Sequence, residues 1–335
     1  MSNKAIGPDS GVDFRGGSVF GAIAQRLLAN NMDPRCLRTN ATLKYDEWKD
    51  IDNEVVKIAT QRMTLLADLR SRGLVRTING MAATVTQYQD ESDMTSAKLS
   101  MAVTDIGEQD RLEYETRLTP LPIAHKSFML DAREVAMGRN NGQPIEVSHA
   151  GSATRKVIEL LEQAAFMGAS SLSAAGGILY GLTDFPYRTT GSLTGAWNLS
   201  SVDGSEILGD VTAIIQDAID ARHYGPYVLY IPAAYEAKLS SQYSQNYPAT
   251  IRSIILESHK ERLQDIRVAD FLTGNNVVLV EMQSDTIRLI NGQDAMPVEW
   301  SEQGGLLMKF KVIAIQPIQL RRDQEGRSGI VHYSA

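Results

Sequence analysis

The amino-acid sequence predicts an α+β protein, because three parts of the chain have different patterns. Residues 48–73 and 148–168 carry apolar residues at intervals of three and four, as amphipathic helices do. Between residues 203 and 282, helix-like and strand-like segments alternate, which is typical of a small α/β unit. After residue 285 the pattern is mainly that of strands. This combination of helices, an alternating unit and a strand-rich end predicts the α+β class.

The composition is that of a folded globular protein long enough for roughly two domains. The chain has 335 residues, of which 43% are hydrophobic and 22% charged. Its net charge of -7 argues against a dedicated nucleic-acid groove. Cys36 is the single cysteine, which rules out an intramolecular disulfide and fits a reducing compartment. The N-terminal region lacks the apolar segment of a signal peptide, and no run of apolar residues has membrane-spanning length, so we expect a cytosol-made protein without a membrane anchor.

Residues 1–43 are rich in Gly, Asn and Arg, with one apolar island at Val19–Leu28. Such a composition is typical of a mobile tail. We expect a partner subunit to hold this segment, since the rest of the chain offers no obvious surface for it. The tail is therefore a first indication of assembly.

A helix is predicted next, within residues 44–76. Gly73 follows a basic segment and is a natural stop. Its apolar stripe comprises Trp48, Ile51, Val55, Ile58, Ala59, Leu66 and Leu69. The pattern predicts one amphipathic helix packed on a core.

The stretch "MAATVTQYQDESDMTSAKLSMAV", residues 81–103, begins with a strand pattern at Val85 and Tyr88 and then becomes too polar for a core. A second strand pattern follows at residues 111–123, so the segment predicts a long two-stranded arm. The acidic cluster Asp90, Glu91 and Asp93 has the carboxylates that a hard cation binds. It lacks the spacing and the glycine of a calcium loop, which favours a solvated, charged tip.

The second long helix is predicted to begin at Ser148, a good N-cap residue, and to end near Gly168. Its expected apolar stripe comprises Ala150, Ala153, Val157, Leu160, Leu161 and Ala164. The Ser-, Gly- and Ala-rich residues 168–177 and the residues 181–195 are predicted to be loops. We place a domain boundary near Gly195.

In the alternating unit, Asp203 and Glu206 have the spacing of a capping box, and a helix pattern follows them. Strands are predicted at 227–231 and 277–282, with a helix after the first. The strand-rich end comprises the strand-like runs "TIRLI", "MPVEW" and "GIVHY" and one long strand-like run at 306–320.

No catalytic or metal-binding motif is found in the sequence. The sequence lacks paired CxxC cysteines, a G-x-S-x-G elbow, a phosphate-binding loop and a dinucleotide fingerprint. The five histidines are too far apart for a metal motif: His125, His149, His223, His259 and His332. Arg321 and Arg322 are expected to be salt-bridge partners and not a phosphate site. We therefore expect no enzyme activity, cofactor or metal, with an α/β enzyme of unknown chemistry as a remote alternative.

The order of these parts, and several segments, resemble the major capsid proteins of tailed phages with the Hong Kong 97-type fold and the related encapsulin shell proteins. "TVTQYQDESDMTSAKLSM" is similar to their extended loop. "YETRLTPLPIAHKSFMLDAREVAMGRNNGQPIEVSHAGSATRKVIELLEQAAFMG" is similar to the return strand and the spine helix. "SDTIRLINGQDAMPVEW" and "FKVIAIQPI" are similar to the closing strands, so that the resemblance covers about residues 44–320.

The resemblance implies a division of the chain into an N-terminal arm (1–43), a peripheral-domain helix (44–76), an extended loop (77–126), a peripheral domain with the spine helix (127–195), an axial domain (196–300) and closing strands of the peripheral domain (301–335). It also implies that the extended loop lies over a neighbouring subunit. The expected assembly contacts are Asp90, Glu91, Asp93, Lys98, Asp105, Glu108 and Arg111. These charges also suit an exposed ribbon that must not aggregate before assembly.

By the same resemblance, the protein is a shell protein of the virion capsid, made in the host bacterial cytoplasm, that self-assembles as hexamers and pentamers around double-stranded DNA. The implied partners are a portal and, as open alternatives, separate scaffold or decoration proteins; the DNA is held without sequence-specific contacts. The extra N-terminal residues favour a phage capsid protein over an encapsulin-type shell around a cargo enzyme, which stays the alternative. A covalent cross-link through Lys98 is not claimed, since no partner Asn is apparent.

Overall fold

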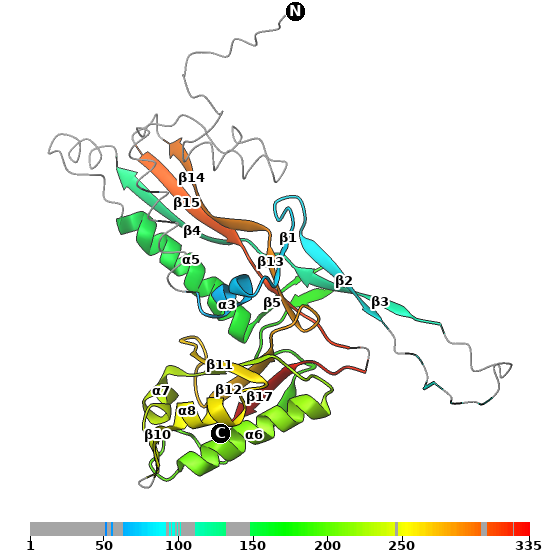
Figure 1. Ribbon diagram of the computed structural model, residues 1–335. Coiled ribbons are helices and arrows are strands. Elements are labelled where there is room, and N and C mark those ends of the chain that lie inside the picture. Colours follow the sequence, from blue (N-terminus) through cyan, green and yellow to red (C-terminus); the bar gives the residue numbers. More distant parts are fainter. Residues whose placement is uncertain are drawn as a thin grey trace, which may run out of the picture.

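The computed structural model describes residues 63–91, 111–131, 148–244, 247–302, 307–323 and 325–335, with the single positions 51, 55, 94, 96, 97, 99 and 101. It consists of an elongated lobe, a compact lobe and a projecting ribbon (Figure 1). The ribbon is formed by β2 (Val85–Glu91) and β3 (Tyr114–Pro120). The expected N-terminal arm at residues 1–43 lies outside the described residues.

The elongated lobe is a three-stranded antiparallel sheet with the helix α5 (Ser148–Met167) packed along it (Figure 1). The strand order is β14 (Gln293–Glu302), β15 (Leu307–Ile315) and β4 (Ala124–Asp131). Across the two neighbouring strands β4 and β15, the rings of Phe128 and Phe310 stack with centroids 4.9 Å apart. The prediction of a helix from Ser148 to the vicinity of Gly168 is confirmed.

The predicted apolar stripe of α5 is wrong at Leu160, and Ala164 is only half-buried. Leu161 is 6% exposed, but Leu160 is 50% exposed and points away from the core. Ile158 and Phe166, which the predicted stripe omitted, are fully buried. Since successive residues on a helix are 100° apart, the buried face passes through Ile158, Leu161 and Phe166, and Leu160 falls beside it.

The compact lobe is a five-stranded mixed sheet with helices packed against it (Figure 1). Its strand order is β11 (Leu263–Val268), β8 (Tyr227–Ile231), β12 (Asn276–Glu281), β17 (Ile330–Ser334) and β7 (Thr189–Ser192). All five residues of β8 are buried, as expected of a central strand. The helices are α6 (Gly204–Asp220), α7 (Ala233–Leu239) and α8 (Ile251–Ser258), and a small hairpin of β9 (Gln242–Ser244) and β10 (Tyr247–Thr250) lies beside α6 and α8. The predicted capping box is present at the start of α6, where the backbone N–H of Asp203 donates to Glu206 Oε2 at 2.9 Å.

Strand pairing places several segments differently from the division that the resemblance implied. β17 was assigned to the closing strands of the peripheral domain, but it lies between β12 and β7 in the compact lobe. β7 was expected to be loop and precedes the boundary placed near Gly195. β14 was assigned to the axial domain, yet it pairs with β15 of the elongated lobe. The chain therefore crosses between the lobes more often than its local patterns indicate.

Two local predictions also need correction. Residues 168–177, expected to be loop, contain the strand β5 (Ala169–Ala174) and lead through Ala175 and Gly176, both at positive φ, into β6 (Gly177–Leu179). The long closing strand is interrupted at Pro317, which has no backbone N–H to donate. Beyond it, β16 (Ile318–Leu320) joins a different sheet, of order β1 (Val75–Thr77), β13 (Ile287–Asn291) and β16.

The first predicted helix is not continuous. Ile51 and Val55 are helical and buried, but Met63 and Thr64 are not helical, and the described helix α3 (Leu65–Ser71) begins after them. Its predicted stop is confirmed, since Gly73 has φ +71°.

A carboxylate from α5 caps the start of α3. Glu162, which is 2% exposed, accepts hydrogen bonds from the backbone N–H groups of Thr64 at 3.0 Å and Leu65 at 2.6 Å, with Leu66 at 3.5 Å. These are donors that a helix leaves unpaired at its N-terminus, so Glu162 acts as a cap supplied by another helix.

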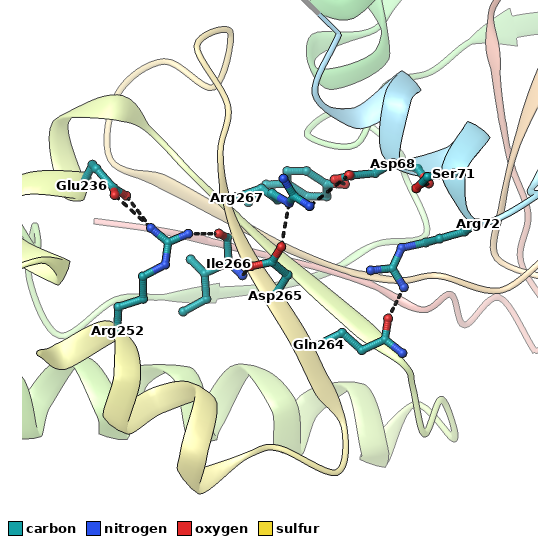
Figure 2. A network of polar contacts seen from close by, with 10 residues as sticks. Asp68, Ser71, Arg72, Glu236, Arg252, Gln264, Asp265, Ile266 and Arg267 are labelled. Atoms are coloured by element: carbon teal, nitrogen blue, oxygen red, sulfur yellow. Dashed lines mark hydrogen bonds and ion pairs between the residues drawn. The ribbon is translucent and has the colours of Figure 1, made fainter. Parts of the chain in front are cut away.

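The other side of α3 contacts the compact lobe (Figure 2). Tyr230 of β8 donates its hydroxyl to Asp68 Oδ2 at 3.0 Å, and Arg267 of β11 lies 3.7 Å from Asp68 Oδ1. Arg72 donates to the side chain of Gln264. Because Glu162 holds one end of α3 and Asp68 its side, this short helix joins the spine of the elongated lobe to the sheet of the compact lobe.

Burial raises the pKa of Glu162 from 4.5 to about 7, with the nearby Asp68 adding to the rise and the three backbone N–H groups opposing it. An acid with a raised folded-state pKa binds its proton more tightly when folded. Its contribution to the free energy of unfolding is therefore greatest below pH 4.5. This contribution falls by about 3 kcal/mol as the pH rises to about 7. We expect Glu162→Gln to remove this part of the pH dependence in urea unfolding followed from pH 4.5 to 8.

The control for Glu162 is Glu159→Gln, one helical turn away on the same helix, where the carboxylate pairs with Lys156 at 2.7 Å near the surface. This variant should keep the wild-type pH slope. Equal slopes in all three proteins would show that Glu162 is ionised normally.

The assignment of the buried face of α5 is tested by two neighbouring substitutions. Leu161→Ala removes a buried side chain and should lower the free energy of unfolding by about 2–5 kcal/mol. Leu160→Ala removes a half-exposed side chain and should change it by less than about 1 kcal/mol. Denaturant titration of the subunit measures both, and a reversed order would mean that the helix is rotated from the described position.

Candidate assembly site

The ribbon is a regular antiparallel pair in which the inner end of β3 is buried and the outer end of β3 is exposed. β2 and β3 pair from Val85 with Pro120 to Glu91 with Tyr114. Seven residues of strand reach about 23 Å. Thr119 and Pro120 at the root are buried, while the four outer residues of β3 are exposed or nearly so. The predicted two-stranded arm is therefore confirmed, and it extends away from both lobes (Figure 1).

Asp90 does not belong to a solvated tip, so this expectation is wrong. The residue is 3% exposed, and its Oδ2 atom accepts from Arg117 of β3 and from Arg322, each at 3.3 Å. Its Oδ1 atom is buried without a hydrogen-bond partner. Through its ion pairs with Arg117 and Arg322, Asp90 links both ribbon strands to the segment that follows β16.

Further contacts from Arg76, Arg321 and Arg322 hold β2 along its length. Arg322 stacks over the ring of Tyr187 at 3.9 Å, and Arg321 lies 5.3 Å from the ring centre of Tyr88. Arg76 donates to the backbone oxygen of Gln87 at 3.3 Å, and Arg321 to that of Gln89 at 3.4 Å. The prediction that Arg321 and Arg322 are salt-bridge partners is confirmed, since Arg321 also pairs with Asp285 at 3.3 Å. Burial, with Asp90 nearby, raises the pKa of Tyr88 to about 12.

The hairpin β5–β6 supports β3 from the other side. Gly177 lies so close to Leu118 that a Cβ atom there would be 2.4 Å from the backbone oxygen of Leu118. A cavity of about 370 Å³ remains between β3, this hairpin and the segment at Tyr187, with Arg117 and Arg322 in its wall. The ribbon thus leaves the body at an angle that packing and ion pairs determine together.

The remaining predicted contact residues are placed only in part. Glu91 ends β2, and Arg111 is exposed just before β3. Asp93, Lys98, Asp105 and Glu108 lie outside the described residues. The sequence reasoning missed the anchoring role of Arg76 and Arg117, whose only signal was their position beside the predicted strands.

Three apolar side chains near the end of the ribbon were also missed. Met94 is 55% exposed, and Leu99 and Met101 are fully exposed. Single exposed apolar side chains are common on protein surfaces, so their exposure does not by itself indicate a contact. We call these three residues the apolar tip.

Among the described residues, one carboxylate is hydrogen-bonded to a histidine ring, as in many catalytic pairs. Glu281 accepts from the ring of His223 at 2.5 Å, from Thr286 Oγ1 at 2.8 Å and from the backbone N–H of Gly225 at 3.1 Å. Burial acts to raise the pKa of Glu281, but the bonds from His223 and Thr286 outweigh it and hold the pKa below its ordinary value. The carboxylate thus joins the turn before β8 to the turn before β13, which is a structural role.

Two classes of site find no support in the part of the chain that the structure describes. No group of three His, Cys, Asp or Glu side chains is arranged to hold a metal ion there. Among the described helices, none has the length and apolar character needed to cross a membrane.

Solved structures that resemble this chain are shells of viruses and related particles. The virus-like particle from Pyrococcus furiosus gives a TM-score of 0.62 at 18% identity, over 87% of this chain and 100% of the other. The capsid of Myoviridae phage XM1 gives 0.63 at 10% identity, over 90% and 98%. The capsid of a native GTA particle gives 0.57 at 11% identity, over 89% and 94%. The expected Hong Kong 97-type capsid fold is thereby confirmed.

Within this fold, the sequence defines a narrower group. Residues 38–333 match a family described as "Family of unknown function (DUF6260)", and the chain belongs to that family. No curated protein sequence matches it.

Replacement of Asp90 tests whether the ion pairs hold the ribbon. Asp90→Asn leaves Arg117 and the largely buried Arg322 without their shared charge, so we expect a loss of about 1–3 kcal/mol in stability. Amide hydrogen exchange in β2 and β3 should become faster than in the wild-type protein, while exchange in β8 should stay unchanged. The control is Glu115→Gln, since Glu115 pairs with the same two arginines from a more exposed position. Unchanged exchange in Asp90→Asn would show that packing alone holds the ribbon.

Proposed function

We propose that this protein is a structural shell subunit that self-assembles into a closed icosahedral particle, as the major capsid protein of a tailed phage head around double-stranded DNA. The observation that carries the proposal is that capsids and a virus-like particle share this fold over 87–90% of the chain. The role is non-enzymatic.

The arrangement of the two lobes and the ribbon supports the proposal. The elongated lobe corresponds to the peripheral domain with α5 as its spine helix, the compact lobe to the axial domain, and the ribbon to the extended loop. A ribbon that projects from its own body and ends in exposed apolar side chains has the form of an intersubunit contact. Repeated around a symmetric particle, even weak contacts of this kind decide whether a shell closes.

The proposed partners follow from that role. Copies of this chain would form hexamers and pentamers, a portal would occupy one vertex, and separate scaffold or decoration proteins would act during or after assembly. The net charge of -7 suits a shell that contains DNA without a phosphate-binding groove. The protein would be made in the bacterial cytoplasm and would end in the virion.

A cell-encoded nanocompartment around a cargo enzyme is the second candidate. The Pyrococcus particle favours it, since its whole chain is covered at 18% identity, against 10% for phage XM1. Electron microscopy of the purified protein, with analysis of the contents, distinguishes them. Large shells with a portal and DNA support the phage head, and small shells with a cargo protein support the nanocompartment; discrete subunits alone would overturn both.

Replacing residues 92–110 with a short Gly/Ser linker tests the role of the ribbon end. The change spares Asp90, so the paired strands β2 and β3 and the subunit fold should stay intact. Shells should not form, because the contacts over a neighbour are lost. Circular dichroism reports the fold, and light scattering with microscopy reports assembly; normal shells from this variant would exclude an assembly role for the ribbon end.

A further inference from the structure

Three arginine side chains project from one face of the small sheet formed by β1, β13 and β16. Arg76 of β1 and Arg288 of β13 share this face, because the register partner of Arg76 lies two residues after Arg288. Gln319 of β16 is in register with Arg288, and Arg321 follows two residues later. The backbone N–H of Arg321 continues the ladder to Thr286 at 2.9 Å. We call Arg76, Arg288 and Arg321 the arginine cluster.

The positive charge of the arginine cluster is neutralised only in part by the acids that the structure describes. Asp285 Oδ1 lies 3.3 Å from Arg321 Nη1 and 3.7 Å from Arg288 Nη2. Arg76 instead donates to the backbone oxygen of Gln87 at 3.3 Å. Burial and the charges of Arg321 and Arg76 lower the pKa of Arg288, which Asp285 opposes. Three guanidinium groups therefore share one carboxylate.

The carboxylate of Asp285 marks the position that an oxygen of a bound anion would take. Its side chain is 81% exposed, so it can turn away into water at little cost. The side chains of Arg321 and Arg288 are only 20% and 28% exposed. Arg288 donates to the backbone oxygen of Ser284 at 2.6 Å, and Arg321 to that of Gln89 at 3.4 Å. The two arginines are thus held in place while their acidic partner is not.

The side-chain amide of Gln319 is a second unusual feature of this face. The residue is fully buried, and within the described part of the chain neither Nε2 nor Oε1 has a hydrogen-bond partner. Buried amide groups nearly always have one. Because Gln319 is in register with Arg288 and two residues from Arg321, its Nε2 can donate to an oxygen that these arginines hold.

We propose that the arginine cluster binds a phosphate-type oxyanion, with the amide of Gln319 as a further donor. Each guanidinium group offers parallel N–H donors that match two oxygens of a tetrahedral anion, and a dianion offsets the surplus positive charge. Asp285 is displaced when the anion binds. Arg322 takes no part, since Asp90 and Glu115 pair with it. The site is independent of the proposed shell function and goes beyond it.

A bound anion would also tie the sheet to the ribbon. Arg76 and Arg321 each donate to a backbone oxygen of β2, at Gln87 and Gln89. An anion that holds both guanidinium groups restrains these contacts as well. We therefore expect phosphate to slow amide hydrogen exchange in β2, while exchange in β8 stays unchanged.

Calorimetric titration of the purified full-length protein with sodium phosphate, at constant ionic strength in chloride, tests the site. We expect one phosphate per chain. Arg288→Gln should weaken binding about tenfold or more, since charge-assisted hydrogen bonds are lost. Asp285→Asn removes the competing carboxylate and should strengthen binding by up to about fivefold. The control Arg155→Gln removes the same charge from an exposed position on α5 and should leave the affinity unchanged.

Gln319→Met tests the amide separately. Methionine has nearly the same volume but no amide, so the buried position stays filled. Phosphate binding should weaken, while the unfolding midpoint without phosphate should not fall, because no hydrogen bond is lost. A glutamine with a purely structural role would give a lower midpoint and an unchanged phosphate affinity.

The outcomes decide the proposal and leave the shell function to the microscopy described above. Wild-type phosphate affinity in either Arg288→Gln or Gln319→Met would overturn the site. A parallel titration with a short DNA duplex distinguishes a free oxyanion from a nucleic-acid backbone. Saturable binding of phosphate, with duplex binding that Arg288→Gln does not change, supports the small anion. Duplex binding that requires Arg288, without saturable binding of phosphate, would overturn it.

Discussion

The buried carboxylate of Glu162 is the constraint on which the arrangement of the two lobes depends. It accepts backbone N–H bonds at the start of α3, and through them it fixes where this short helix begins against α5. From that position α3 presents Asp68 to Tyr230 of the compact lobe. The apolar core continues across the same junction, where Phe166 of α5 meets the ring of Tyr230 edge-on at 5.4 Å. A shift of α3 would thus disturb polar and apolar contacts of both lobes together.

The ribbon shows the same principle, because contacts between distant parts of the chain hold it. Its strands supply length, but its direction is set by Asp90 with Arg117 and Arg322 and by the close approach of Gly177 to Leu118. A stiff projection loses little conformational entropy when its end binds a partner. The acidic residue that was expected to meet a neighbour directly therefore has another task, which is to hold the projection that carries the tip.

Much of the fold was predictable from the sequence because the patterns are local. The boundaries of α5, the capping box at Asp203 and Glu206, the ribbon strands and the central strand β8 depend on residues a few positions apart. The resemblance to capsid proteins rested on the order of such elements, which is why it led to the correct fold. The apolar tip was overlooked because Met94, Leu99 and Met101 lie within a segment whose average character is polar.

The sequence by itself determined the elements, their approximate order and the class of fold, since periodicity and caps are encoded within each segment. Only the tertiary structure decided which sheet receives β17, that Leu160 faces outward and that Asp90 is buried. Each of these depends on partners that are distant in the chain, such as Arg322 for Asp90 and β12 for β17. The start of α3 has the same origin, because a carboxylate on α5, nearly a hundred residues away, pairs the N–H groups that the sequence around Thr64 leaves open.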